Sequence, residues 1–248
     1  MNIREYYDEM SAVYLQQLIW ICLFLSVFLT VLSAIGRLFY MIWVLLAVFV
    51  IVLYFLSRYL YYHYRKNQSS YKMPYKSDYK EPHSFMVMAM PSEEDRIQLF
   101  MSNGISEWSI HRVQSKQKNN AVKSDIYTIS NQNRPIQAEA AFCSNAASNY
   151  AVVQTGQKEL ARIELQSMEK SKSCFFCGKD EFTVMRSGKS TRIYKNSIEL
   201  ACYEKGWMPF SWQQNFSPNT PILHVNTSQL KDLLVIFTLL IGKLKQEG

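Results

Sequence analysis

Two cysteines separated by two residues form the pattern in this chain that most suggests chemistry. Cys174-Phe-Phe-Cys177 is followed by Gly178 and Lys179, and this C-x-x-C-G-K form is half of a zinc knuckle, in which both thiolates bind one metal ion. A second ligand pair at matching spacing is missing, so further ligands would have to come from separate segments. We therefore predict no cofactor and interpret both cysteines as ordinary residues of a β-turn. Zinc binding and thiol redox activity are the alternatives. The distant residues that such a site would need are Cys143, Cys202, His111 and His224.

Other catalytic patterns are incomplete. The four histidines are dispersed, and no Ser-His-Asp or Cys-His order stands out. The segment 185–189 (MRSGK) resembles a phosphate-binding loop, but Thr183 stands where that loop requires its first glycine. We predict that the protein is not an enzyme.

The elements that would position these residues begin with two apolar runs, 15–35 and 38–57. Neither run contains Asp, Glu, Lys or Arg, and each is close to the roughly 20 residues that a helix needs to cross a bilayer. Only Gly36 and Arg37 separate the two runs, and so short a connection predicts a tight transmembrane hairpin. Acidic residues precede the first run, so a cleaved signal peptide is not expected.

The net charge of +7 is unevenly distributed. Residues 58–80 hold six Lys or Arg against one Asp, and this excess directly after the second run predicts that both termini and the C-terminal domain are cytoplasmic, in a cell membrane. Tyrosines gather at the same exit, where amphipathic rings fit the headgroup region. We predict contact with anionic phospholipids here, whereas a plain topology signal is the alternative. The lipid-surface candidates are Arg58, Tyr59, Tyr61, Tyr62, Arg65, Lys66 and Lys72.

The chain thus divides into a cytoplasmic N-terminus (1–14), two transmembrane helices, a basic Tyr-rich linker (58–84) and a cytoplasmic domain (85–248). Residues 81–248 carry only +3, so nucleic acid is not expected as a partner. Within the domain, Ser92 and the apolar residues up to Phe100 predict a short helix that ends at Asn103-Gly104.

From Asp125 onward, short β-type runs alternate with turn residues. Because no long helices separate these runs, they predict a mainly antiparallel barrel or sandwich. The run 233–241 (LLVIFTLLI) is apolar on every side of a helix but too short to span a membrane, so it predicts a helix buried in protein. A short membrane anchor is the alternative. The fold class expected is therefore α+β: a transmembrane hairpin followed by a β domain with a buried C-terminal helix. The predicted strands are 126–129, 136–142, 150–153, 160–165, 182–185, 192–194, 197–203 and 222–225.

These strand-turn-strand units, such as IYTISNQNRPIQAEA and YAVVQTGQKELARIEL, are followed by the helix DLLVIFTLLIGKL. In this the sequence resembles the tubby C-terminal-like superfamily, which includes phospholipid scramblase and LURP-one-related domains, over residues 125–244. The resemblance implies a closed barrel with the last helix through its centre, and a membrane-associated module that binds phospholipid. It supplies no position-specific lipid or calcium residues.

Taken together, the sequence predicts an integral membrane protein with a tubby-like binding or scaffold domain at the inner leaflet. Two alternatives have different bases: a zinc- or thiol-dependent activity at Cys174 and Cys177, and an accessory role in a membrane transport or secretion complex, where the hairpin would pair with another membrane protein.

Overall fold

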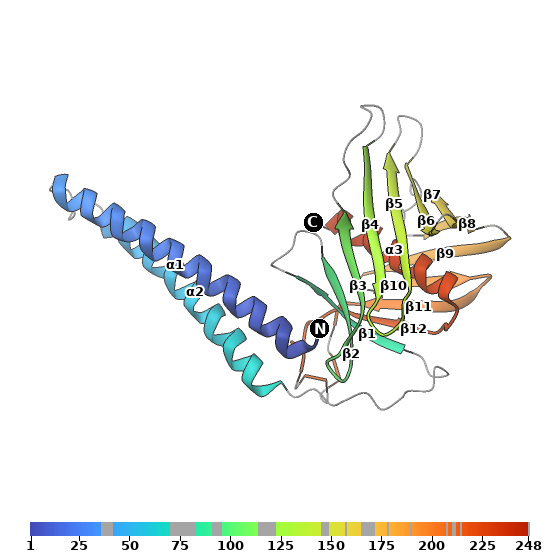
Figure 1. The fold of residues 1–248 in the computed structure, drawn as a ribbon, viewed down its shortest axis with the longest axis horizontal. Coiled ribbons are helices and arrows are strands. Elements are labelled where there is room, and N and C mark those ends of the chain that lie inside the picture. The colour runs from blue at the N-terminus through green and yellow to red at the C-terminus, as the bar shows by residue number, and fades with distance from the viewer. Residues whose placement is uncertain are drawn as a thin grey trace.

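The computed structural model describes residues 1–35, 42–69, 83–90, 96–113, 123–144, 149–156, 158–164, 172–177, 179–188, 190–206, 208–209, 212–213 and 215–247. Two long helices come first, then a run of strands, then one more helix (Figure 1). This order confirms the predicted α+β class. The helices are α1 (Ile3–Ile35), α2 (Ile42–Gln68) and α3 (Leu230–Glu247). The strands are β1 (His83–Ala89), β2 (Ile97–Met101), β3 (Ser106–Val113), β4 (Lys123–Asn131), β5 (Gln137–Ser144), β6 (Asn149–Thr155), β7 (Lys158–Glu164), β8 (Lys172–Cys177), β9 (Asp180–Ser187), β10 (Ser190–Lys195), β11 (Ile198–Glu204) and β12 (Ile222–Val225).

All of these strands belong to one 12-stranded antiparallel sheet in the order β7-β6-β5-β4-β3-β2-β1-β12-β11-β10-β9-β8. The sheet is open, with β7 and β8 at its edges. These edges approach one another without forming a ladder in the described residues, and the Cys177 thiol donates to the Leu160 carbonyl oxygen at 3.7 Å. The β domain is therefore a strongly curled sheet rather than a closed barrel or a sandwich of two sheets.

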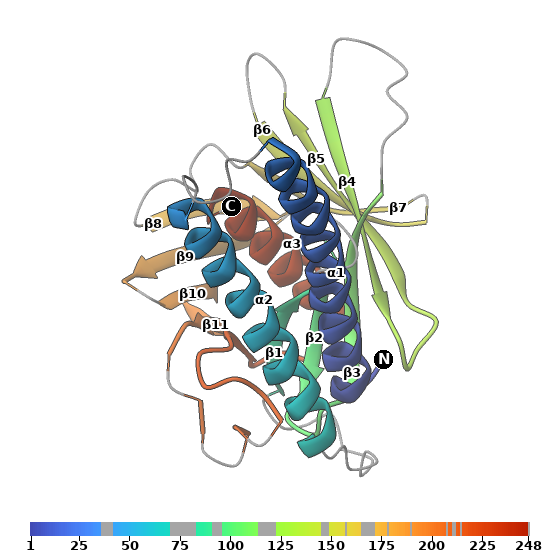
Figure 2. The same ribbon diagram turned by 90° about the vertical axis from the view of Figure 1, so that its left-hand side faces the viewer.

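Helix α3 lies within the concave side of this sheet (Figures 1 and 2). Every residue from Leu234 to Ile241 is at most 3% exposed, including Thr238, whose hydroxyl donates to the Leu234 carbonyl oxygen. Phe237 packs on Trp108 and Phe85, with ring centroids 5.1 and 6.4 Å away. The prediction of a buried apolar C-terminal helix is confirmed, and the sheet surrounds the helix as its missing polar face requires.

The convex side of the sheet carries a second apolar cluster. In β1, Phe85 and Val87 belong to the inner core, whereas Met86 and Met88 belong to the outer cluster. Because alternate residues of a strand point to opposite faces, both faces of β1 are apolar and both are buried. Phe100 of β2 and Ile222 of β12 extend the outer cluster, and the start of α1 covers it.

Both long helices are apolar and exposed over most of their length. Ile3–Val31 and Trp43–Gln68 are long and apolar enough to cross a membrane, and the most apolar window of each is not buried at all. The helices project together from one side of the β domain (Figure 1). They extend beyond the predicted spans, since α1 begins at Ile3 and α2 continues to Gln68. The predicted turn at Gly36-Arg37 and residues 70–82 of the predicted linker lie outside the described residues, whereas residues 58–68 of that linker belong to α2.

The helix predicted from Ser92 to Phe100 is wrong over its apolar part. Ile97–Met101 is strand β2, which pairs with β1 and β3. Leu99 faces the inner core and Phe100 the outer cluster, so a strand buried on both faces gave an apolar run that looked helical. Residues 91–95, where the helix was expected to begin, lie outside the described residues.

Candidate functional site

The C-x-x-C pair does not form a turn. Cys174 and Cys177 both lie in β8, where residues three apart point to opposite faces of the sheet. Cys174 is exposed, and its sulfur lies 3.4 Å from the Thr183 hydroxyl, whereas Cys177 is buried in the inner core. Within the described ranges, no group of three or more His, Cys, Asp or Glu side chains is arranged to hold a metal ion. The geometry of a zinc knuckle, with both sulfurs on one ion, is thus not present in β8.

The thiols are expected to differ sharply in reactivity. A water-soluble maleimide at neutral pH should label Cys174 of the full chain in detergent micelles quickly, because its thiol is exposed. Cys177 and Cys202 should react only after unfolding, since both are buried and burial raises the pKa of Cys202 to about 12. Peptide mass spectrometry at successive times measures the extent of labelling at each cysteine. Cys174→Ser should remove the fast labelling, and the control variant Cys177→Ser should leave it unchanged. Equal rates at Cys174 and Cys177 would contradict the placement of β8.

The contact between the hairpin and the β domain brings together far more of the predicted site residues. It begins with the first turn of α1, which is capped by Asn2: the Glu5 amide donates to the Asn2 side-chain oxygen, and the Asn2 amide donates to the Glu5 carboxylate. The Ile3 amide donates to the Gly104 carbonyl oxygen at 2.7 Å, and the Ser106 amide donates to the Met1 carbonyl oxygen at 3.1 Å. The start of α1 is therefore joined to the β2–β3 turn by backbone hydrogen bonds.

Side chains on one face of α1 then pack on the outer cluster. Ile3, Tyr6, Tyr7 and Met10 follow the i, i+3, i+4, i+7 spacing of a single helix face, and all four are buried. The Tyr6 hydroxyl donates to the Ala89 carbonyl oxygen at 3.3 Å. The Tyr7 hydroxyl donates to the Asn215 carbonyl oxygen at 2.7 Å. Burial raises the pKa of Tyr7 to about 12 and that of Tyr6 further still, so both phenols remain neutral donors well into the alkaline range.

The last turns of α2 hold the same region of the domain. The Arg65 guanidinium donates to the carbonyl oxygens of Gln213 and Phe216, at 3.1 and 2.6 Å. The Lys66 ammonium forms an ion pair with Asp8 of α1 at 2.6 Å. Arg65 and Lys66, predicted to face lipid, thus bind the protein's own backbone and its own carboxylate.

The remaining predicted lipid-surface residues that the structure describes make their ring contacts and hydrogen bonds with side chains of α1 and α2. Tyr59 stacks on His63 along α2, with ring centroids 5.8 Å apart. Tyr62 stacks on Tyr14 of α1 at 5.3 Å. Arg58 is exposed, and its Nε lies 3.4 Å from the Tyr54 hydroxyl. Lys72 lies outside the described residues.

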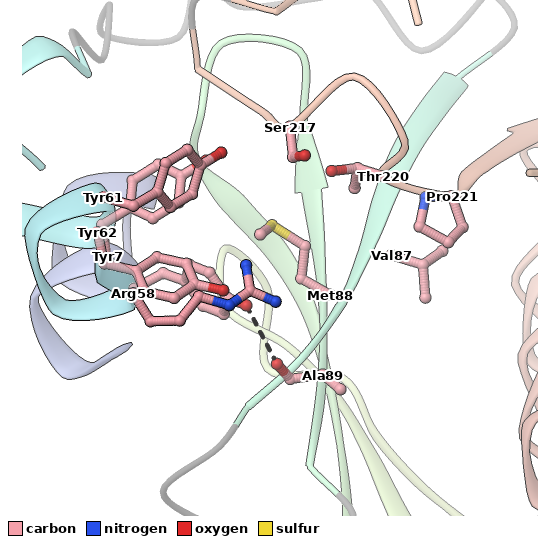
Figure 3. A pocket seen from close by; sticks show the side chains of 11 residues that line it. Tyr7, Arg58, Tyr61, Tyr62, Val87, Met88, Ala89, Ser217, Thr220 and Pro221 are labelled. Carbon is pink, nitrogen blue, oxygen red and sulfur yellow. Dashed lines mark hydrogen bonds between the residues drawn. The ribbon is translucent and has the colours of Figure 1, made fainter. Parts of the chain in front are cut away.

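A cavity of about 300 Å³ lies between this end of the hairpin and the β domain. Side chains from α1 and α2 form one wall of the cavity, and strand β1 forms a second. The segment 217–221, which precedes β12, forms the third wall (Figure 3). The cavity joins three of the predicted residues, Arg58, Tyr61 and Tyr62, to parts of the chain that sequence reasoning did not connect with them. Its lining is Tyr6, Tyr7, Arg58, Tyr61, Tyr62, Val87, Met88, Ala89, Ser217, Thr220 and Pro221.

Sequence reasoning missed the residues contributed by α1, β1 and the segment 217–221. A signal for α1 was present in the helical spacing of Ile3, Tyr6, Tyr7 and Met10. Another was the run 85–90 (FMVMAM), since a strand that is apolar at every position is buried on both faces. No pattern in Ser217, Thr220 and Pro221 would have indicated their place beside the hairpin.

No family model, curated protein or solved structure matches this chain. The tubby-like resemblance therefore stays a prediction.

Proposed function

We propose that this chain is an integral protein of the cell membrane whose cytoplasmic β domain is a binding or scaffold module without catalytic activity, held at the inner leaflet by a two-helix transmembrane hairpin. The observation that carries the proposal is the continuity of α1. One helix runs from the buried, hydrogen-bonded turn at Ile3 into an exposed apolar stretch that includes Trp20, Phe24 and Val27.

Such continuity fixes the domain relative to the membrane. A flexible linker would let a tethered domain sample many orientations, whereas a docked helix transmits the direction of the span to the sheet. Arg65 and Lys66 hold α2 at the same place, so two rigid elements leave the domain together. The domain would then present one constant face to the bilayer, which suits a module that binds a membrane component.

The orientation follows from the basic residues after the second span, which favour the cytoplasmic side. The tubby-like assignment is part of the proposal, and the apolar helix enclosed by a curled antiparallel sheet supports it. Binding of anionic phospholipid is proposed on the basis of the tyrosines and basic residues where the hairpin meets the domain.

Cys174 provides a test of this placement, because it is an exposed thiol of the β domain. The full chain is expected to stay in the membrane pellet after alkaline carbonate extraction. A membrane-impermeant maleimide should label Cys174 in inverted vesicles but not in intact cells, and Cys174→Ser identifies the labelled site. Carbonate extraction into the supernatant would refute integral insertion, and labelling in intact cells would refute the cytoplasmic orientation.

A further inference from the structure

We propose that the cavity between α1, α2 and β1 binds the phosphate-bearing headgroup of an anionic membrane phospholipid, with Arg58 as the residue that binds the phosphate. This inference rests on the proposed membrane placement of the hairpin and assigns a ligand and a site to it.

The charge of the lining favours an anion. Among the described residues that line the cavity, Arg58 alone carries a charge. Its described contacts are with Tyr54, a neutral phenol: the hydrogen bond at 3.4 Å and a cation–π contact at 5.7 Å. Arg65 and Lys66 are instead engaged with backbone carbonyls and with Asp8. Of the basic residues described at this end of α2, Arg58 is therefore the one that lines the cavity, and the planar fork of its guanidinium suits phosphate oxygens.

The uncharged lining supplies donors and aromatic walls. The hydroxyls of Ser217 and Thr220 and the guanidinium of Arg58 border the same space (Figure 3). Thr220 is 7% exposed and lines the cavity, with its hydroxyl directed toward Ser217 (Figure 3). Tyr61 and Tyr62 add phenol groups from α2. The hydroxyls of Ser217 and Thr220 lie beyond the Met88 side chain from Arg58 (Figure 3), where they could donate to further oxygens of a headgroup bound at Arg58.

The position of the cavity favours a lipid over a soluble phosphate ester. Arg58 directly follows the predicted span, and Ile51 and Tyr54, seven and four residues before it and so on the same side of α2, are exposed. Acyl chains could lie along this apolar surface while the headgroup enters the cavity. A volume of about 300 Å³ is at the lower end for small-molecule sites, so it accommodates a headgroup but not the acyl chains as well.

The test uses the full chain, purified in detergent and exposed to mixed micelles containing phosphatidylcholine and phosphatidylglycerol. Native mass spectrometry then counts the phospholipids retained. We expect phosphatidylglycerol to be retained over phosphatidylcholine, and Arg58→Gln to weaken that retention about tenfold, as for the loss of one charge-assisted hydrogen bond. Arg58→Lys, which keeps the charge but loses the fork, should fall between the two.

Arg4→Gln is the matched control. Arg4 is exposed near the same end of the hairpin but does not line the cavity, so its replacement makes the same change in net charge and should leave retention unchanged. Hydrogen exchange in residues 1–14 should be the same in wild type and Arg58→Gln, which confirms that the hairpin remains docked.

Several outcomes would overturn the inference. Equal loss in the Arg4 and Arg58 variants would indicate general charge attraction, and equal retention of both lipids would remove the selectivity for anions. Displacement of the lipid by soluble glycerol phosphate would assign the site to a soluble ester. If wild type retains no phospholipid while Cys174 labelling and carbonate resistance behave as expected, the lipid site is refuted and the proposed membrane placement stands.

Discussion

Replacing Leu234 or Phe237 with alanine is expected to lower the free energy of unfolding of the β domain by about 2–5 and about 3–5 kcal/mol, the range for large buried side chains. Both residues are fully buried. Consecutive helix residues are rotated by about 100°, so positions 234–237 together sample every side of α3. Val235→Ala and Ile236→Ala should therefore also destabilise the domain, because the sheet leaves no side of this helix exposed.

Leu230→Ala is the control on the same helix, since Leu230 is 36% exposed, and it should cost less than about 1 kcal/mol. Guanidinium unfolding of the full chain in detergent micelles, followed by near-ultraviolet circular dichroism, measures the difference. If one position among 234–237 tolerates alanine as well as Leu230 does, α3 has a face turned away from the sheet. The helix would then be amphipathic rather than enclosed.

The final helix and the later strands except β8 could be predicted because their signals are local, whereas the segment of β8 around Cys174 and Cys177 was expected to form a β-turn. A run such as 233–241 has no polar side, and that property alone requires enclosure. The strands from β4 onward are separated by turn residues, for instance Gly156 and Gly188, which have positive φ angles, and such turns can be recognised without knowing what the strands pack against. What could not be predicted locally was whether the sheet closes, since this depends on β7 and β8 at opposite ends of the strand order.

The first three strands and the docked start of α1 were not predicted. The outer faces of β1 and β2 and the buried face of α1 pack in one cluster, so neither side of this contact can be recognised by itself. Met86 and Met88 on the outer face of β1 would be exposed apolar residues without Ile3 and Tyr6 above them. The run 85–90 therefore lacks the apolar-polar alternation that identifies most surface strands. The start of α1 was read only as a polar segment before a span, although its buried face is as regular as that of any packed helix.

The candidate lipid residues show a related limit. Basic residues after a span indicate orientation by their number, but number does not distinguish a side chain facing lipid from one bound to protein. Arg65 and Arg58 lie seven positions apart, close to two helical turns, and so on similar sides of α2. Arg65 reaches the carbonyls of Gln213 and Phe216, whereas Arg58 borders a cavity. The segment 213–221 makes this difference, and nothing in the basic segment 58–80 itself encodes it.

The docking of α1 depends on a close approach that only glycine permits at position 104. Gly104 has φ +82°, and a Cβ added there would lie 2.6 Å from Cγ2 of Ile3. Gly104→Ala is therefore expected to weaken docking through a steric clash of about 1–3 kcal/mol, in addition to backbone strain. Hydrogen exchange in segments 1–14 and 98–110 should become roughly tenfold to a hundredfold faster, at about tenfold per 1.4 kcal/mol. Exchange in α3 should not change, because its core lies on the other face of the sheet.

Gly156→Ala separates the clash from the strain. Gly156 also has a positive φ, +59°, but an added Cβ there has no neighbour within 4 Å, so its replacement carries strain alone and should leave exchange in residues 1–14 unchanged. The double variant Ile3→Ala with Gly104→Ala removes the clashing Cγ2 and should be less destabilised than the sum of the two single variants, as expected for residues in direct contact. Strict additivity, or equal effects of Gly104→Ala and Gly156→Ala on residues 1–14, would show that Ile3 is not seated against the β2–β3 turn. The hairpin would then be tethered to the β domain rather than docked on it, and the fixed orientation proposed for the domain would lose its basis.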